Sequence, residues 1–293
     1  MTAGTYALAQ LLRALPRERI TRAVGRLCDM DLPPAVSRAA VGIYARAYRV
    51  DLDEAAPTDN PYPSFDAFFT RPLRPGVRDW SHDDATLASP ADGRLDAMGP
   101  VDGRTIVVKG KPYDAGTLLG SDRAAERYRG GTFAVVYLSP RDYHRVHAPA
   151  AGKLVAVRSL PGELFPVNSV SERHIPRFLS RNRRVAIEIE TVHFGLVTVV
   201  MVAAMIVGRV TVSGVDARDV PFGDHQLSPP LTREIGDEIG IFHLGSTAVI
   251  FLEPGRVSSG GFDRALGSIR VGDELARASR QDGSNGSKEH PDG

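Results

Sequence analysis

Short runs of apolar residues alternate with glycine and proline along most of this chain, from about residue 86 onward. Runs of this kind, rich in valine and isoleucine and bounded by turn residues, are typical of β-strands. The most apolar stretch, Leu196 to Val207, has twelve residues and stops at Gly208, and we interpret it as a buried strand. Further strands are expected at RTIVVKG, GGTFAVVYL, GKLVAVRSL, RRVAIEIET and GRVTVSG.

The first fifty residues follow a helical pattern instead. One expected helix carries apolar residues at helical spacing and arginines on its other side, namely Tyr6, Leu8, Leu11, Leu12 and Leu15 against Arg13, Arg17, Arg19, Arg22 and Arg26. A second helix is expected after Pro33 and Pro34, because prolines are tolerated in the first turn of a helix. The predicted fold class is therefore α+β, with N-terminal helices followed by a mainly antiparallel β barrel or sandwich-like domain.

Three regions follow from this pattern. Residues 1–60 form an N-terminal helical region that ends in the polar, proline-rich connector DLDEAAPTDNPYPS, and residues 61–275 form the β-rich domain. Leu275 is the last large apolar residue of the chain. Residues 276–293 contain none, so we expect a disordered tail.

Composition and charge exclude several classes of protein. With 293 residues, 42% hydrophobic and 24% charged, the chain has ordinary globular usage, and a net charge of +1 argues against a nucleic-acid-binding protein. Cys28 is the only cysteine, which excludes an intramolecular disulfide and a cysteine-based zinc site, and we expect it to be buried. We find neither a spanning apolar segment nor the pattern of a signal peptide.

Positive charge is concentrated at the N-terminus. Residues 1–50 hold eight arginines against Glu18, Asp29 and Asp31. A basic amphipathic helix of this kind can lie in the interface of an anionic membrane, or it can pack against its own domain. The pattern alone does not decide between the two.

Four local features are candidates for chemistry. SPADG contains Asp92 before a glycine, which is turn chemistry in most proteins. YHRVHAP contains His144 and His147, candidate acid–base groups, but the segment offers no second ligand pair for a metal, and we expect none. PGELFPVN could line an apolar pocket or anchor a loop, and Gly236 to Gly255 contains the sequence LGST.

The serine of LGST is Ser246. Glycine before a serine leaves the intervening carbonyl open to approach, because glycine has no side chain. The segment is not the G-x-S-x-G turn of many serine hydrolases, because Leu244 and Ala248 occupy the glycine positions. The missing motif weakens a hydrolase interpretation.

In combination, the motifs resemble the phosphatidylserine decarboxylase proenzymes, a family of pyruvoyl-dependent enzymes with the LGST motif in their bacterial members. The resemblance covers about residues 60–260 and rests on the ordered segments FFTRPLRPGVR, SPADG, LSPRDYHRVHAP, PGELFPVN, RNRRV, AMIVGRV and GDEIGIFHLGST. The match is poor at both termini, so the mode of membrane contact does not follow from it.

The resemblance implies that Asp92, His147 and Ser246 are the self-processing triad. Ser246 would attack the carbonyl of Gly245, and the chain would be cut between these residues into a β chain, 1–245, and an α chain, 246–293. Ser246 would thereby become a covalent pyruvoyl cofactor. The two fragments are expected to remain associated through sheet pairing, and a homo-oligomer is possible.

The implied reaction converts phosphatidylserine to phosphatidylethanolamine and carbon dioxide through a Schiff base on the pyruvoyl group. Either His144 or His147 would return the proton, and spacing does not choose between them. Because the substrate stays in the bilayer, the resemblance favours peripheral binding at the cytoplasmic side of a bacterial cell membrane, with the basic helix as the contact.

Two other functions remain open from the sequence. A serine hydrolase could use Asp92, His147 and Ser246 without cutting its own chain. A noncatalytic lipid-binding module could carry the Gly-Ser pair only as a turn, although it would not explain why the three residues coincide with motifs of one family.

Overall fold

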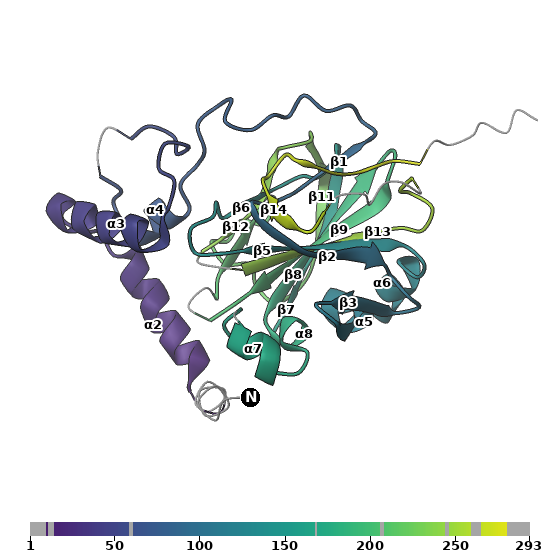
Figure 1. Ribbon diagram of the computed structural model, residues 1–293, viewed down its shortest axis with the longest axis horizontal. Coiled ribbons are helices and arrows are strands. Elements are labelled where there is room, and N and C mark those ends of the chain that lie inside the picture. Colours follow the sequence, from purple (N-terminus) through teal and green to yellow (C-terminus); the bar gives the residue numbers. More distant parts are fainter. Residues whose placement is uncertain are drawn as a thin grey trace, which may run out of the picture.

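A computed structural model describes residues 10, 15–58, 61–167, 169–205, 208–243, 246–258 and 265–279. From residue 15 onward, the first elements that the structure describes are three helices, and they lie to one side of a large β-sheet domain (Figure 1). They are α2 (Arg17–Asp29), α3 (Pro34–Tyr48) and α4 (Phe65–Phe69). The helices followed by antiparallel strands confirm the predicted α+β class.

The centre of the molecule is an eight-stranded antiparallel sheet in the order β11-β7-β8-β9-β13-β5-β2-β14. Its ends are β11 and β14, so over the described residues the sheet is open and does not close into a barrel. The strands are β2 (Gly93–Pro100), β5 (Thr132–Leu138), β7 (Gly152–Leu160), β8 (Arg184–Thr191), β9 (Gly195–Ala203), β11 (Gly223–Arg233), β13 (Ser246–Leu252) and β14 (Gly267–Ile269).

Smaller elements cover the two faces of this sheet. A three-stranded sheet has the order β10-β12-β6, and two further pairs are β1-β15 and β3-β4. These strands are β1 (Thr86–Ala88), β3 (Thr105–Val108), β4 (Lys111–Asp114), β6 (Arg145–His147), β10 (Val210–Val212), β12 (Glu238–Phe242) and β15 (Glu274–Arg277). The short helices are α5 (Ala115–Leu119), α6 (Asp122–Arg127), α7 (Ser169–His174) and α8 (Phe178–Arg181).

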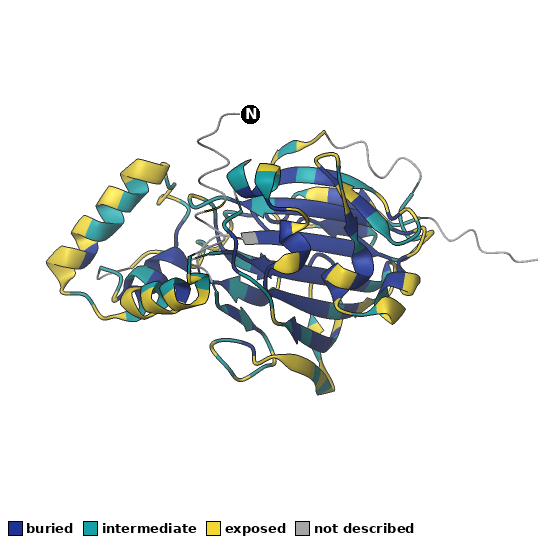
Figure 2. Cartoon of the chain, turned by 90° about the horizontal axis from the view of Figure 1, so that it is seen from below, coloured by how far each residue is buried: buried dark blue, intermediate teal, exposed yellow. Residues whose placement is uncertain are grey.

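Strand β13 shows how the sheet separates two hydrophobic cores. Ala248, Ile250 and Leu252 belong to the core that also contains residues of β6, β10 and β12. Val249 and Phe251 belong to the other core, together with residues of α5 and α8. Successive side chains of a strand point to opposite faces, so β13 is buried on both, as Figure 2 shows for the central strands. Its apolar run with little alternation follows from this double burial.

The N-terminal helices contact the domain through few side chains. Cys28 of α2 is buried in a small cluster with Phe69 and Ala204, as expected. Apolar side chains of α2, α3 and the adjoining segments are exposed, namely Leu27, Met30, Val36, Ile43, Tyr48 and Leu52. Over the described residues, no helix has the length and apolarity required to span a membrane.

Both ends of the chain extend past what the structure describes. The predicted apolar positions Tyr6, Leu8, Leu11 and Leu12 lie outside the described residues. At the C-terminus, β15 pairs with β1 and includes Ala276 and Arg277, so the sheet extends two residues into the predicted tail. Residues 280–293 of that tail lie outside the described part.

Candidate active site

Ser246 is the first residue of β13, the fifth strand of the eight in the large sheet. Its backbone is paired with Leu138 of β5 on one side and with Ala203 of β9 on the other. Leu244 and the candidate cleavage residue Gly245 lie outside the described residues. The candidate nucleophile is thus at the end of a strand that is held along both edges.

The turn after Leu138 brings both candidate histidines to this end of the sheet. The carboxylate of Asp142 accepts hydrogen bonds from the backbone N–H and the hydroxyl of Ser139, each at 2.7 Å. These two hydrogen bonds stabilise the turn in which the chain reverses direction after β5. Aspartate side chains commonly cap turns in this way. The chain then passes through His144 into β6, which pairs with β12, the strand that precedes the LGST segment.

His144 is fully buried and its ring lies against Phe69 in a tilted arrangement, with 4.1 Å between the ring centroids. Its Nδ1 lies 2.7 Å from the carbonyl of Asp142, so Nδ1 carries the proton and Nε2 is left as the basic nitrogen. Nε2 is buried and has no hydrogen-bond partner among the described residues. Burial lowers the pKa of His144 to about 3, so the ring is neutral at physiological pH.

His147 lies at the end of β6, between two fixed partners. Its Nδ1 donates to the carbonyl of Gly236 at 2.6 Å, and its Nε2 lies 2.9 Å from the hydroxyl of Tyr143. Gly236 has φ +89°, and a Cβ there would lie 2.4 Å from the Trp80 ring, so only glycine fits. Burial lowers the pKa of His147, which keeps Nε2 unprotonated and able to accept a proton at neutral pH.

Asp92 is held in the SPADG turn between β1 and β2. Its carboxylate accepts from the backbone N–H of Val271 at 2.7 Å and from Arg78 at 2.6 Å. Gly93 follows with φ +146°, and a Cβ there would lie 2.1 Å from the carbonyl oxygen of Tyr137. Burial raises the pKa of Asp92, although the Arg78 guanidinium acts in the opposite direction.

The structure brings the Asp92 turn against β6 without a direct bond between the two candidate side chains. The backbone N–H of His147 donates to the carbonyl of Pro90 at 2.9 Å. Over the described residues, no hydrogen bond joins the Asp92 carboxylate to the His147 ring. Tyr143 contacts His147 and also lines a cleft of about 210 Å³ together with Asp92.

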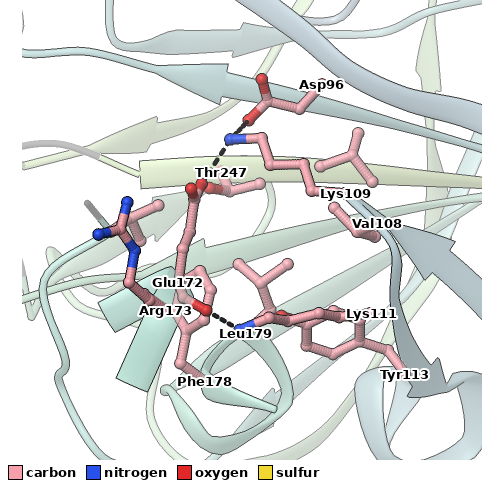
Figure 3. A pocket seen from close by; sticks show the side chains of 12 residues that line it. Asp96, Val108, Lys109, Lys111, Tyr113, Glu172, Arg173, Phe178, Leu179 and Thr247 are labelled. Carbon is pink, nitrogen blue, oxygen red and sulfur yellow. Dashed lines mark hydrogen bonds and ion pairs between the residues drawn. The ribbon is translucent and has the colours of Figure 1, made fainter. Parts of the chain in front are cut away.

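A cavity of about 230 Å³ lies on the other face of the sheet, beside Thr247 (Figure 3). Thr247 is the residue after Ser246, and its hydroxyl oxygen is buried and has no partner among the described residues. Lys109 lines the cavity between Asp96 and Glu172, with 2.8 Å from its Nζ to the Asp96 carboxylate. Lys111 and Arg173 also line it, so the cavity has a polar, cationic side and an apolar side formed by residues such as Phe178.

Comparison with known proteins gives the same family as the motifs. A family model described as phosphatidylserine decarboxylase matches residues 65–277. A phosphatidylserine decarboxylase proenzyme of Anaeromyxobacter sp. is 38% identical over 279 residues, which covers 91% of this chain and 96% of the relative. Proenzymes of Bordetella avium and Marinobacter nauticus are 38% and 40% identical, over 89% and 83% of this chain and 91% and 87% of theirs.

The chain belongs to the phosphatidylserine decarboxylase family. The family motifs are distant in sequence, yet Asn182 of RNRRV ties two of them to the candidate site. Its side chain bonds the backbone N–H and carbonyl of Phe165, at 2.9 and 2.8 Å, and donates to the carbonyl of Ala203 at 2.9 Å. Ala203, which directly precedes AMIVGRV, is the residue paired with Ser246. The backbone N–H of Met205 in that motif donates to the carbonyl of Phe165 at 3.4 Å, so PGELFPVN, RNRRV and AMIVGRV converge next to the candidate nucleophile.

Several residues of the candidate active site were not identified from the sequence. Arg78 and Asn182 lie within the quoted motifs FFTRPLRPGVR and RNRRV, and a charged or amide side chain inside a motif was the available signal. Tyr143 adjoins His144 in YHRVHAP and was not weighed as a partner of His147. Thr247 lies in the quoted LGST motif, whereas Lys109 carries no local signal, because the cavity forms only when β4, α7 and β13 come together.

Proposed function

We propose that this chain is a self-cleaving phosphatidylserine decarboxylase proenzyme in which Ser246 becomes a pyruvoyl group. The single observation that carries the proposal is the position of Ser246: it begins β13 at the end of the sheet where the turn after β5 brings His144 and His147. Membership of the family supports the substrate, phosphatidylserine, and the product, phosphatidylethanolamine.

In the proposed self-cleavage, His147 accepts the hydroxyl proton of Ser246 at Nε2. The serine oxygen bonds to the carbonyl carbon of Gly245, the peptide C–N bond breaks, and an ester between the two residues replaces the peptide. Loss of the proton from the α carbon of residue 246 then expels the Gly245 carboxylate and leaves dehydroalanine. Water hydrolyses dehydroalanine to the pyruvoyl group and ammonia. Gly245 adds no side chain that would obstruct the attack.

Asp92 is proposed to act on His147 through its charge. The carbonyl of Gly236 already fixes the ring and its tautomer, because it accepts from Nδ1. The Asp92 turn contacts His147 through the Pro90 carbonyl, which accepts from the His147 backbone N–H, and the negative charge of the Asp92 carboxylate on that turn would favour the imidazolium that forms when Nε2 takes the serine proton. Arg78 and the N–H of Val271 hold that carboxylate in place.

Two features near residue 246 could serve the proposed chemistry, and they lie on opposite faces of the sheet: the two histidines, and the cavity beside Thr247. The Thr247 hydroxyl is buried and has no partner within the part of the chain that the structure describes, and the cavity beside it is of headgroup size, with Lys109 and Lys111 on its wall. The pyruvoyl carbonyl would bond the substrate amine and accept the electron pair released when carbon dioxide leaves. His144 offers a buried basic nitrogen at the same end of the sheet, and His147 offers a second.

The two fragments are proposed to remain together after the cut. Strand β13 would belong to the α chain, whereas both of its neighbours, β5 and β9, would belong to the β chain. Seven residues of β13 are paired with β5, and six of them also with β9. Ala248, Val249, Ile250 and Phe251 are fully buried, so separation would expose a large apolar surface to water.

Peripheral membrane binding at the cytoplasmic side is proposed for the N-terminal helices. Exposed Leu27, Met30 and Ile43 lie on or next to helices that also carry arginines on their exposed surface. Such a surface buries apolar side chains at the acyl boundary and places guanidinium groups among anionic headgroups. A substrate with two acyl chains would then reach the enzyme without leaving the bilayer.

Intact-protein mass spectrometry of freshly purified chain under denaturing conditions tests this function. The wild-type chain is expected to give residues 1–245 and 246–293, the latter with a pyruvoyl in place of the serine, and Ser246→Ala a single uncut chain. Ser228→Ala, at an exposed serine of β11, is the control and should be cut like the wild type. An uncut wild-type chain that reacts with a serine-directed phosphonate would instead indicate a hydrolase. An uncut, unreactive chain would favour the lipid-binding module.

A further inference from the structure

A buried histidine–carboxylate pair lies beside the LGST segment. It consists of His243 and Asp66 and is separate from Asp92 and His147. Nδ1 of His243 lies 2.9 and 3.0 Å from the two carboxylate oxygens of Asp66. Their side chains are 7% and 6% exposed, so the pair is shielded from solvent. His243 follows β12 and Asp66 lies on α4, so the contact joins residues 177 positions apart.

The other ring nitrogen of His243 is also engaged. Nε2 lies 2.8 Å from the hydroxyl of Thr211, and that hydroxyl donates to the carbonyl of Arg218 at 2.6 Å. The Asp66 carboxylate accepts from Nδ1, and the Thr211 hydroxyl, which donates to the Arg218 carbonyl, occupies Nε2. The ring therefore cannot rotate without breaking a hydrogen bond on each side.

Asp66 in turn connects this pair to the N-terminal helix α2. Arg218 bridges Asp66 at 3.0 Å and Asp29, the last residue of α2, at 2.6 Å. Arg209 makes a second bridge, with a bidentate contact to Asp29 and a longer one of 3.4 Å to Asp66. Two guanidinium groups thus lie between the two carboxylates, and the repulsion between Asp29 and Asp66 is offset.

The location of His243 gives this network a role in the proposed reaction. His243 is two residues before Gly245, whose carbonyl carbon is the proposed target, and Ser246 on the other side is held in the sheet between Leu138 and Ala203. The segment that contains the scissile bond is therefore anchored at both ends. Attack on a carbonyl requires the reacting atoms to be held close and aligned, and small displacements cost large factors in rate.

We propose that Asp66 and His243 are positioning residues for self-cleavage, and that α2 takes part in maturation through Asp29, Arg209 and Arg218. This inference rests on the proposed function. Asp29 of the docked helix α2 binds Arg209 and Arg218, and these two arginines bind Asp66. Asp66 binds His243, which fixes the chain that leads into Gly245. The N-terminal region would then couple cutting of the chain to the assembly of its helices on the domain.

The test measures the rate of self-cleavage after synthesis in a cell-free system, by intact mass. Asp66→Asn, which keeps the size of the side chain, is expected to slow cleavage by about tenfold or more. Asp29→Asn should slow it by a smaller factor, because two arginines still hold Asp66. His243→Gln, whose side-chain amide can donate to Asp66, should be cut faster than His243→Leu, which has no donor. The matched control is Asp31→Asn, at an exposed carboxylate next to α2, which should be cut like the wild type.

Hydroxylamine separates positioning from later steps, because it cleaves the ester after the acyl shift and leaves a hydroxamate on Gly245. If Asp66 positions the carbonyl, hydroxylamine should not restore scission in Asp66→Asn. The inference would be overturned if hydroxylamine restored scission in Asp66→Asn. It would also be overturned if Asp66→Asn and Asp29→Asn were cleaved at the wild-type rate. Thermal unfolding of each variant in the Ser246→Ala background shows whether it folds, and if Asp66→Asn does not, Asp29→Asn and the two His243 variants decide. A wild-type chain that is never cut would refute the proposed function instead.

Discussion

The hydroxyl of Tyr143 lies 2.9 Å from Nε2 of His147 and occupies the nitrogen that is proposed to accept the proton of Ser246. The neutral ring accepts this hydrogen bond, whereas the imidazolium cannot, since both of its nitrogens carry protons. Tyr143 therefore favours the neutral base, in the same direction as burial. The hydroxyl must turn away before serine can take its place.

We predict the pH dependence of self-cleavage from this contact. The pKa of His147 is lowered from 6.5 by burial, so the base is neutral at and above that pH and the rate should be constant there. The rate should fall only on the acidic side, as Nε2 becomes protonated. Tyr143→Phe removes a bond to the neutral ring, so the midpoint should move to higher pH. Cleavage rates between pH 5 and 8 check this, and an unchanged midpoint would contradict it.

Replacement of Asp92 should slow self-cleavage less than replacement of His147. The carbonyl of Gly236, rather than the carboxylate, sets the tautomer of His147, so Asp92→Asn leaves the base correctly oriented. We expect a loss of about tenfold, which corresponds to about 1.4 kcal/mol of imidazolium stabilisation. His147→Gln, which has no basic nitrogen, should abolish cleavage. Equal losses for the two variants, measured as initial rates, would show that Asp92 has a more direct part.

Loss of the Asn182 side chain should destabilise the fold next to Ser246. Its three hydrogen bonds satisfy backbone groups of Phe165 and Ala203, and Asn182 is fully buried. Asn182→Ala leaves these groups without partners and should lower the free energy of unfolding by about 3 kcal/mol. Urea unfolding in the Ser246→Ala background measures the change. Asn182→Asp, which keeps an acceptor for the N–H of Phe165 but no donor, should also destabilise the fold.

Charge introduced into the exposed apolar surface of α3 should weaken membrane binding. Ile43 is 69% exposed on this helix, so Ile43→Asp is expected to change the folded structure little and to reduce sedimentation with anionic vesicles. The matched control is Val192→Asp, because Val192 is 81% exposed in the turn between β8 and β9, at the end of the sheet opposite to Ser246. Equal sedimentation of the two variants would argue against α3 as the contact.

The strands were predictable because their apolar runs directly report burial. The stretch from Leu196 fills a central strand, and the two runs around LGST became β12 and β13. The open sheet, and its division of the apolar residues into two cores, did not follow from the pattern. Both depend on the order in which strands pair, and adjacent strands such as β13 and β5 come from distant parts of the chain.

The motifs predicted which residues form the candidate site, but not how their side chains are held. Asp92, His147 and Ser246 follow from the resemblance, but the partners of their side chains do not. Gly236 binds His147 from 89 residues away, and Asp66 binds His243 from 177 residues away. Contacts of this kind depend on tertiary packing, which leaves no periodic signal in the sequence.

The pairing of β13 on both edges has a consequence for the lifetime of the enzyme. If the cofactor is made from Ser246, it is attached to a strand that cannot leave the sheet without breaking the pairing with both β5 and β9. A fresh α chain could not replace a damaged one, and no free cofactor could be loaded from solution. Each molecule would mature once, and chemical loss of its carbonyl would be repaired only by synthesis of a new chain.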